Sequence, residues 1–139
     1  MKISIVYAST TGNTEMMANC IAEDLKLESD LSIFTATEAN KDDILASDII
    51  LLGSPAMGAE VLEDSMEDFF SKIENDLNGK KIGLFGSYDW GNGQWILDWE
   101  DRVRNQGGII VAENLMIHLT PTDEDLEKCS SWAKKLITK

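Results

Sequence analysis

The sequence has 139 residues, of which 43% are hydrophobic and 27% charged, and its 12 basic and 25 acidic residues give a formal net charge of −13. This length fits one domain, residues 1–139, with room for a sizeable core. So acidic a surface repels nucleic acids and anionic lipid, and its long-range field attracts basic protein partners. No apolar run approaches the ~20 residues of a membrane span, so we expect neither a nucleic-acid ligand nor a membrane.

Cys20 and Cys129 lie far apart in the sequence and form no CxxC motif or Cys/His cluster. Such cysteines are typical of reduced, half-buried thiols, which indicates a cytoplasmic protein. Residues 1–7 carry one positive charge and begin a strand-like run, so we expect no signal peptide.

Five short apolar runs predict strands. The third is apolar almost throughout, as expected of a parallel strand that is buried on both faces. The predicted strands cover residues 3–7, 31–34, 48–53, 81–86 and 108–112.

Apolar residues recur at helical spacing between and after these strands, and a weaker helix is expected over residues 40–46. Alternation of strand and helix predicts an open parallel sheet covered on both faces, which is a doubly wound α/β fold. Ligands of such folds bind beyond the carboxyl ends of the strands, so function is expected in the loops after strands one, three and four. The helical positions are Met17, Ile21 and Leu25; Met66, Phe69, Phe70, Ile73 and Leu77; Ile96, Trp99 and Val103; and Leu126, Cys129, Ala133 and Leu136.

The loop after the first strand reads STTGNT, residues 9–14. Backbone N–H groups at a helix start, with the positive end of the helix dipole, suit a phosphate group. The loop lacks the lysine of a Walker A motif and the GxGxxG dinucleotide pattern, and an ordinary helix N-cap would use the same residue types. The candidate phosphate ligands are Ser9, Thr10, Thr11, Gly12, Asn13 and Thr14.

The loop after the third strand reads GSPAMGAE, residues 53–60. Met57 beside a glycine could cover a flat apolar ligand, because thioethers pack well on aromatic faces. Glu60 could accept a hydrogen bond from a ring N–H. A surface loop whose methionine packs into the core is the alternative interpretation.

The loop after the fourth strand reads GSYDWGNGQW, residues 86–95. Trp90 lies between Asp89 and two glycines, where no regular element can bury it, and this favours a stacking partner. Trp95 and Trp99 fit a helix core and are assigned no function. An apolar methionine, an indole and a phosphate-binding turn together describe a site for a flat heteroaromatic monophosphate.

The motifs STTGNT, SPAMGAE and GSYDWGNGQW resemble, in order and spacing, the phosphate loop and the two ring-binding loops of flavodoxins, specifically the short-chain type of anaerobic bacteria. The similarity runs along nearly the whole chain. It implies a flavodoxin-like fold with a five-stranded parallel sheet in the order 2-1-3-4-5. The single strand expected between Gly108 and Thr120 leaves no room for the insertion of the long-chain type.

The resemblance implies non-covalently bound FMN and a low-potential one-electron carrier that shuttles between neutral semiquinone and hydroquinone, without a substrate of its own. The first loop, with Ser54 and Ser87, would surround the phosphate. The implied FMN-binding residues are Ser9, Thr10, Thr11, Gly12, Asn13, Thr14, Ser54, Pro55, Ala56, Met57, Gly58, Ala59, Glu60, Ser87, Tyr88, Asp89, Trp90 and Gly91.

The resemblance also implies roles around the isoalloxazine ring. Met57 and Trp90 would enclose the ring, and Glu60 would bind its N3–O4 edge. Backbone groups of Asp89 and Gly91 would lie near the N1–O2 edge.

Two residues depart from the family pattern. Ala59 follows Gly58, the glycine whose carbonyl would accept a hydrogen bond from N5 after one-electron reduction. In a type II turn Ala59 would need a positive φ, at a cost of about 1–2 kcal/mol, which would favour the flipped peptide. Asp89 stands where glycine is frequent, and its carboxylate would disfavour negative charge on the ring.

Other functions use the same architecture. A quinone or nitro reductase using NAD(P)H needs a pocket for a second substrate, and His118, the only histidine, is expected at a strand end. A signalling receiver domain needs an acidic pair after strand one, a phosphoacceptor Asp after strand three and a Lys near strand five, none of which this sequence has. A flavodoxin-like activator dedicated to one partner, such as those serving ribonucleotide reductase, stays open.

We expect the protein to be a monomer. Its expected partners are ferredoxin- and flavodoxin-type reductases or low-potential metalloenzymes, which it would bind through their basic faces. An acidic run beside the ring would form the docking rim, although a solvated helix face would show the same pattern. The rim residues are Glu60, Glu63, Asp64, Glu67 and Asp68.

Overall fold

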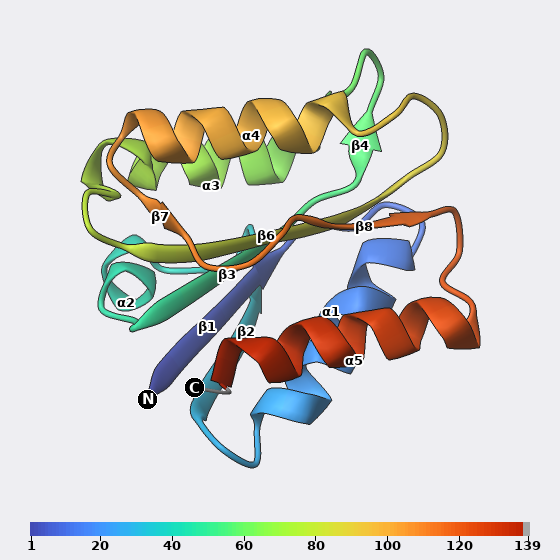
Figure 1. Ribbon diagram of the computed structural model, residues 1–139. Coiled ribbons are helices and arrows are strands. Elements are labelled where there is room, and N and C mark those ends of the chain that lie inside the picture. The colour runs from blue at the N-terminus through green and yellow to red at the C-terminus, as the bar shows by residue number, and fades with distance from the viewer. Residues whose placement is uncertain (138–139) are drawn as a thin grey trace.

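The computed structural model describes residues 1–137. Its main sheet is parallel, with strand order β2-β1-β3-β6-β7, and β8 pairs with β6 as well. The expected doubly wound fold with order 2-1-3-4-5 is therefore confirmed, with β7 and β8 sharing the fifth position (Figure 1). The strands are β1 (Lys2–Tyr7), β2 (Asp30–Thr35), β3 (Ile49–Gly53), β6 (Lys81–Tyr88), β7 (Ile109–Ile110) and β8 (Leu115–His118).

Helices cover both faces of the sheet, with α1 and α5 on one face and α3 and α4 on the other (Figure 1). Each segment with helical spacing contains a helix, and Leu77, just beyond the last turn of its segment, is also buried. Among residues 1–137, no helix combines the length and apolarity needed to cross a bilayer. The helices are α1 (Asn13–Leu25), α2 (Lys41–Leu45), α3 (Asp64–Ile73), the 3₁₀ turn η1 (Glu74–Asp76), α4 (Gln94–Asn105) and α5 (Asp123–Ile137).

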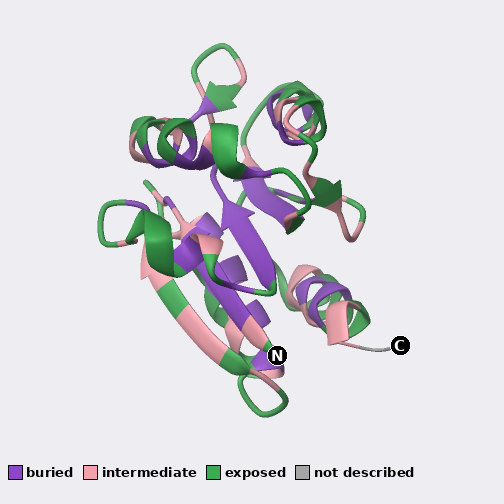
Figure 2. Cartoon of the chain, turned by 90° about the vertical axis from the view of Figure 1, so that its left-hand side faces the viewer, coloured by how far each residue is buried: buried purple, intermediate pink, exposed green. Residues whose placement is uncertain are grey.

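The two faces of the sheet carry separate apolar clusters. All five residues of β3 are buried, as its unbroken apolar run predicts, and Figure 2 shows burial along the central strands but only on the inward side of the helices. Trp95 and Trp99 are each 1% exposed, which confirms their assignment to the helix core.

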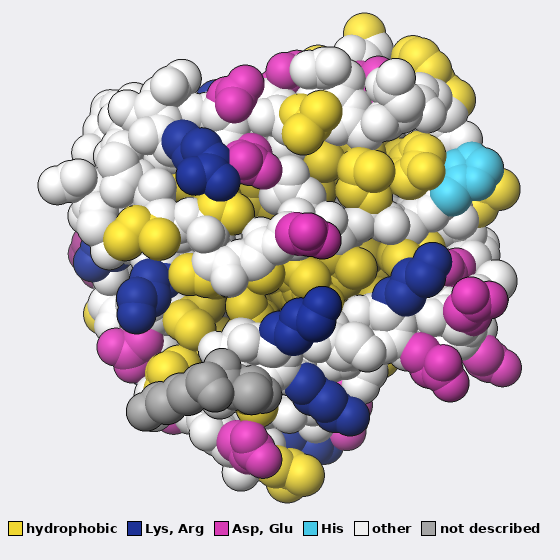
Figure 3. All heavy atoms as spheres, viewed as in Figure 1, with side chains coloured by type: hydrophobic (Ala, Val, Ile, Leu, Met, Phe, Trp, Pro, Cys, Tyr) yellow, Lys and Arg dark blue, Asp and Glu magenta, His cyan; other side chains and the backbone are white. Residues whose placement is uncertain are grey.

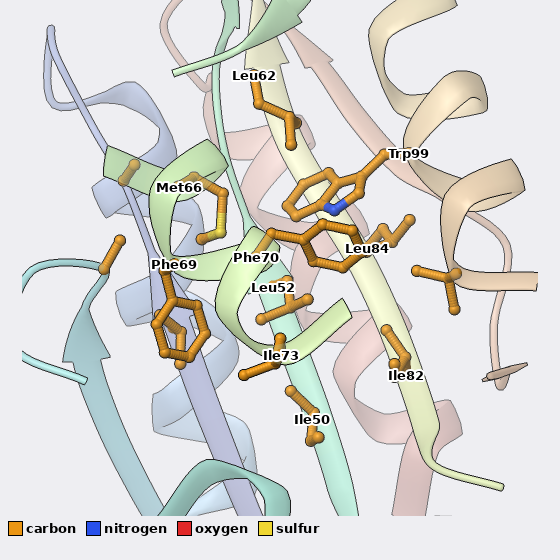
Figure 4. Packing of buried hydrophobic residues seen from close by; sticks show 14 of the residues in the cluster. Ile50, Leu52, Leu62, Met66, Phe69, Phe70, Ile73, Ile82, Leu84 and Trp99 are labelled. Carbon is orange, nitrogen blue, oxygen red and sulfur yellow. The ribbon is translucent and has the colours of Figure 1, made fainter. Parts of the chain in front are cut away.

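Phe70 lies at the centre of the cluster between α3 and α4 (Figure 4). Its ring and the Trp99 indole are nearly perpendicular, with centroids 5.9 Å apart and planes at 85°. The indole nitrogen makes no hydrogen bond and is turned into the core toward Phe70 and Leu84. The guanidinium carbon of Arg102 lies over the same Phe70 ring, 4.8 Å from its centroid, and makes a cation–π interaction with it.

The fifth sheet position is interrupted, whereas one strand over residues 108–112 was expected. Ile110 pairs with Ile82 and Leu115 pairs with Phe85, so the edge has two more residues than β6 between these pairs. Val111 still donates its N–H to the Ile82 carbonyl at 3.0 Å, whereas the last two residues of the gap bond to the helices. Trp132 of α5 donates to the Glu113 carbonyl at 2.6 Å, and the Asn114 amide donates to Glu100 of α4 at 2.8 Å.

Gly86 brings the end of β3 close to β6. A Cβ at Gly86 would overlap the carbonyl oxygen of Ser54, the residue that follows β3, and the Ser54 N–H donates to the Phe85 carbonyl at 3.2 Å. This contact is between backbones, so neither side can move away without breaking the ladder.

We expect Gly86→Ala to lower the free energy of unfolding by about 1–3 kcal/mol or more, because overpacking against backbone cannot be relieved by a rotamer change. Gly83→Ala, on the same strand, is the matched control. Its Cβ would lie 2.8 Å from the Leu51 Cδ2, a flexible side-chain end, so we expect a smaller loss. Urea unfolding of both variants measures the difference, and equal losses would contradict the backbone clash.

Candidate functional site

The loop after β1 presents unpaired backbone donors at the start of α1. Gly12 caps this helix in the left-handed region, with φ of 92° and no side-chain cap. The Ser9 hydroxyl oxygen accepts the N–H groups of Gly12 at 3.2 Å and Glu15 at 3.3 Å, which folds the turn. The backbone N–H groups of Thr10, Thr11 and Asn13 make no hydrogen bond within residues 1–137. They and the helix dipole therefore form an anion-binding turn.

Thr14 connects this turn to the third loop. It is 1% exposed, and its hydroxyl lies 2.7 Å from that of Ser87, which is 4% exposed. This buried pair joins α1 to the end of β6, so the first and third loops keep a fixed separation.

The loop after β3 contains a short antiparallel hairpin, β4 (Ala56–Met57) and β5 (Val61–Leu62), that the sequence pattern did not predict. Its turn has positive φ at Gly58 (49°) and Glu60 (55°). Ala59 does not have a positive φ, so the type II turn in which we expected it to be strained is not present. The next residue, Glu60, carries that strain instead.

Glu60 links the second loop to the third. Its Oε1 accepts the N–H groups of Gly93 at 3.1 Å and Gln94 at 2.9 Å, at the start of α4. No side chain of the α4 segment caps this helix, so a residue from another loop satisfies its first donors. Gly91 packs so closely that its Cβ, if present, would lie 2.5 Å from the Glu60 carboxyl carbon.

The three loops enclose one cavity of about 260 Å³. Met57 and Trp90 both line it, and Trp90 is 62% exposed. Every lining residue belongs to the predicted site. These residues are Thr10, Thr11, Asn13, Pro55, Ala56, Met57, Gly58, Ser87, Tyr88, Asp89 and Trp90.

The remaining predicted residues do not line this cavity. Ser9 and Gly12 line a neighbouring polar cavity of about 390 Å³, which reaches Thr35 and Glu63 and was not foreseen. Thr14 and Ser54 are buried beneath the loops. Ala59 and Gly91 are exposed. Glu60 is half-buried and lines a separate cavity of about 100 Å³ together with Glu67 and Arg102. Neither of the two cavities at the first loop is lined by a Lys or Arg.

All polar atoms of Ser54 form hydrogen bonds within the protein. Its hydroxyl donates to the Pro55 carbonyl at 2.9 Å and accepts the Glu63 N–H at 3.0 Å. Its carbonyl accepts the Trp95 indole N–H at 3.3 Å. The side chain is completely buried and lines none of these cavities.

The expected acidic rim is partly used inside the protein. Glu63 caps α3 by accepting the Ser65 N–H at 3.1 Å. Both carboxylate oxygens of Glu67 accept from Arg102 at 2.8 Å, and Arg102 also bonds Glu74. Glu67 is thus paired with a cation that it shares with Glu74. Asp64 and Asp68 remain exposed, with no such partner in the described chain.

A contact at His118 was also not predicted. His118 ends β8, as expected of a strand-end residue, and its Nε2 lies 2.8 Å from the Asp89 carbonyl oxygen. The two residues are 29 positions apart, so no local pattern could have indicated the contact.

Comparison with known proteins agrees with this geometry. The flavodoxin family profile matches residues 5–132. Flavodoxins of Clostridium beijerinckii and Megasphaera elsdenii are 42% and 40% identical over 137 and 135 residues, and each alignment covers 96% of this chain and 98% of the relative.

Solved structures give the same result. The solution structure of two-electron reduced M. elsdenii flavodoxin matches with a TM-score of 0.83 at 42% identity, covering 95% of this chain and 98% of that one. The crystal structure of oxidised flavodoxin 1 from Bacillus cereus matches with a TM-score of 0.89 at 31% identity, covering 99% and 97%.

The site combines an anion-binding turn with a cavity lined by a methionine and an indole, and both lie at the carboxyl ends of a doubly wound sheet. Such a site defines a nucleotide-binding α/β protein. The chain belongs to the flavodoxin family. Flavodoxins are electron carriers rather than enzymes, and their cofactor is FMN. The protein is therefore an FMN-binding electron-transfer protein that works with redox partners.

The residues present fit this cofactor. Unpaired N–H groups of the first loop, without a cation, suit a phosphate monoester. Met57 and Trp90 offer the apolar surface that a flat ring needs. FMN supplies the redox chemistry, and the protein supplies its binding and electrostatics.

The Arg102–Glu67 pair predicts a pH dependence of stability. Hydrogen bonding from Arg102 lowers the pKa of Glu67 below its ordinary value of 4.5. A carboxyl group whose pKa is lowered in the folded state adds stability at pH values above its ordinary pKa. This added stability is lost as the pH falls through the lowered pKa. We therefore expect Arg102→Met to be less stable than wild type near neutral pH and the difference to narrow below pH 4.5.

Urea unfolding of both proteins at several pH values checks this. Arg104→Met is the control, because Arg104 is more exposed than Arg102 and its i,i+4 pair with Glu100 is expected to contribute about 0–1 kcal/mol. A difference between wild type and Arg102→Met that stays constant with pH would contradict the prediction.

Proposed function

We propose that the protein is a low-potential one-electron carrier, in which bound FMN alternates between neutral semiquinone and hydroquinone while electrons pass to partner proteins. The observation that carries this proposal is the cavity between the three loops, with neutral phosphate donors at one end and Met57 and Trp90 in its lining. All 139 residues would act as one FMN-binding domain.

The proposed phosphate ligands are the loop of residues 9–14 and the Ser87 hydroxyl. Ser54 would act from beneath by fixing the loops, because its own polar atoms are already paired. Thr14 would likewise orient Ser87 through their shared hydrogen bond. No cation lines either cavity at the first loop, so the phosphate charge would remain uncompensated.

The proposed ring contacts come from Met57, Gly58, Glu60 and Trp90, with backbone groups of Asp89 and Gly91. Both N–H bonds to Glu60 go to Oε1, which leaves Oε2 able to accept a further donor from the ring. Gly58 already has a positive φ of 49°, which supports its role as the flexible peptide of the turn.

Negative charge around the ring supports the low potential. Each close carboxylate costs an added electron about 1 kcal/mol or more, depending on the local dielectric. Glu60 and Asp89 are the carboxylates in these loops, and neither has an ion pair in residues 1–137. The negative field of the protein would therefore disfavour addition of the second electron more strongly than addition of the first.

The proposed partners are basic faces of ferredoxin- or flavodoxin-type reductases and low-potential metalloenzymes, met by a monomer in the cytoplasm. Acidic side chains gather at the lower right of Figure 3, near the start of α5, whose first turn contains Asp123, Glu124 and Asp125. Both cysteines are free, and burial raises the pKa of Cys129 to about 12, which supports a reducing compartment with an unreactive thiol.

Anaerobic stepwise reduction of the purified protein, followed by visible absorption, tests the proposed function. We expect a yellow protein that passes through a stable blue one-electron state before it becomes colourless. Bleaching in a single two-electron step would contradict the one-electron carrier. A colourless protein that FMN cannot reconstitute would contradict the cofactor assignment.

The rate of electron transfer to a basic reductase should fall as salt rises from about 0.05 M to about 0.5 M, because ions screen the attraction between the two proteins. Replacing Asp64 and Asp68 together by Asn should make this dependence shallower. Replacing Glu28 by Gln and Asp30 by Asn, exposed at the opposite end of the sheet, is the matched control. An unchanged slope in the first variant would exclude this rim as the docking surface.

A further inference from the structure

The segment that carries Trp90 has few anchors of its own. Trp90, Gly91 and Asn92 are exposed, and their backbones make no hydrogen bond within residues 1–137. Gly91 and Gly93 have left-handed φ values of 86° and 96°, which glycine adopts at no steric cost but does not enforce. Burial and backbone bonding therefore do not determine where the Trp90 indole lies.

The two ends of this segment are held by single side chains. Glu60 accepts the Gly93 N–H at 3.1 Å, and His118 bonds the Asp89 carbonyl at 2.8 Å. A carbonyl oxygen can only accept, so the His118 Nε2 carries a proton and donates it. Both the neutral Nε2–H tautomer and the imidazolium form can make this bond.

The His118 ring is itself fixed. Its centroid lies 5.0 Å from that of Tyr88, and the Tyr88 ring lies 5.7 Å from the buried Trp95. His118 pairs with Tyr88 in the sheet, and the next N–H, of Leu119, donates to the Tyr88 carbonyl at 2.8 Å. The stack and the sheet together aim the imidazole N–H at Asp89.

We propose that His118 is a positioning residue for the cofactor: it fixes the backbone at Asp89 and thereby the direction in which Trp90 enters the cavity. This inference rests on the proposed role of Trp90 as a wall of the FMN site. His118 is exposed, so we expect its replacement to change global stability little and to act mainly on the loop. The two effects can therefore be measured separately.

Two variants test the proposal. His118→Gln keeps an N–H donor, whereas His118→Met keeps a flexible side chain of similar size without one. Losing one hydrogen bond should weaken FMN binding by about three- to tenfold in His118→Met, while His118→Gln stays within about twofold of wild type. Quenching of flavin fluorescence gives the dissociation constant, and urea unfolding of each apoprotein gives its stability, which should be the same for both variants.

A second readout needs no cofactor. In the apoprotein, the ¹⁵N heteronuclear NOE of the Trp90 and Gly91 amides should fall in His118→Met, because the segment gains motion on the picosecond to nanosecond timescale, and should be kept in His118→Gln.

Wild-type affinity in His118→Met, or equal losses in both variants, would overturn the proposal. So would a loss of apoprotein stability that accounts for the lost affinity. Failure of the wild-type protein to bind FMN would instead contradict the proposed function, and the NOE comparison would still decide whether His118 orders the segment.

Discussion

The arrangement of the cofactor loops depends on the hydrogen bonds of Ser54, a buried residue just after β3. Its N–H bonds the Phe85 carbonyl of β6, its carbonyl accepts from Trp95 of α4, and its hydroxyl accepts the N–H that precedes α3. Buried polar atoms need partners within the protein, and Ser54 satisfies its own by joining three elements. Gly86 makes this possible, because a side chain there would occupy the position of the Ser54 carbonyl.

The second constraint is electrostatic. The protein has a formal net charge of −13, yet its family cofactor carries a phosphate, and no Lys or Arg lines the two cavities at the strand ends. Arg102, which could have supplied a cation on the α3–α4 side, bonds Glu67 and Glu74 within the helical layer instead. Affinity for the phosphate then depends on backbone donors and the helix dipole, whose strength requires an undistorted start of α1.

Periodicity predicted the doubly wound fold, and the resemblance of three local motifs to flavodoxin loops implied the residues that line the central cavity. The interrupted edge was not predictable. Val111 still donates its N–H to the Ile82 carbonyl, and the two residues before β8, Glu113 and Asn114, bond to two distant helices instead of to β6. Contacts of Glu60 and His118 were missed for the same reason, since their partners lie about thirty positions away and belong to other elements.

The interrupted edge also limits how these molecules can associate. An uninterrupted outer strand offers a row of free N–H and C=O groups to a strand of a neighbouring molecule, which is a route to aggregation. Here the outer position consists of a two-residue and a four-residue strand, and the Glu113 carbonyl between them is occupied by Trp132. The β7/β8 edge therefore offers a neighbouring chain a shorter template than the opposite edge, which is the continuous six-residue strand β2.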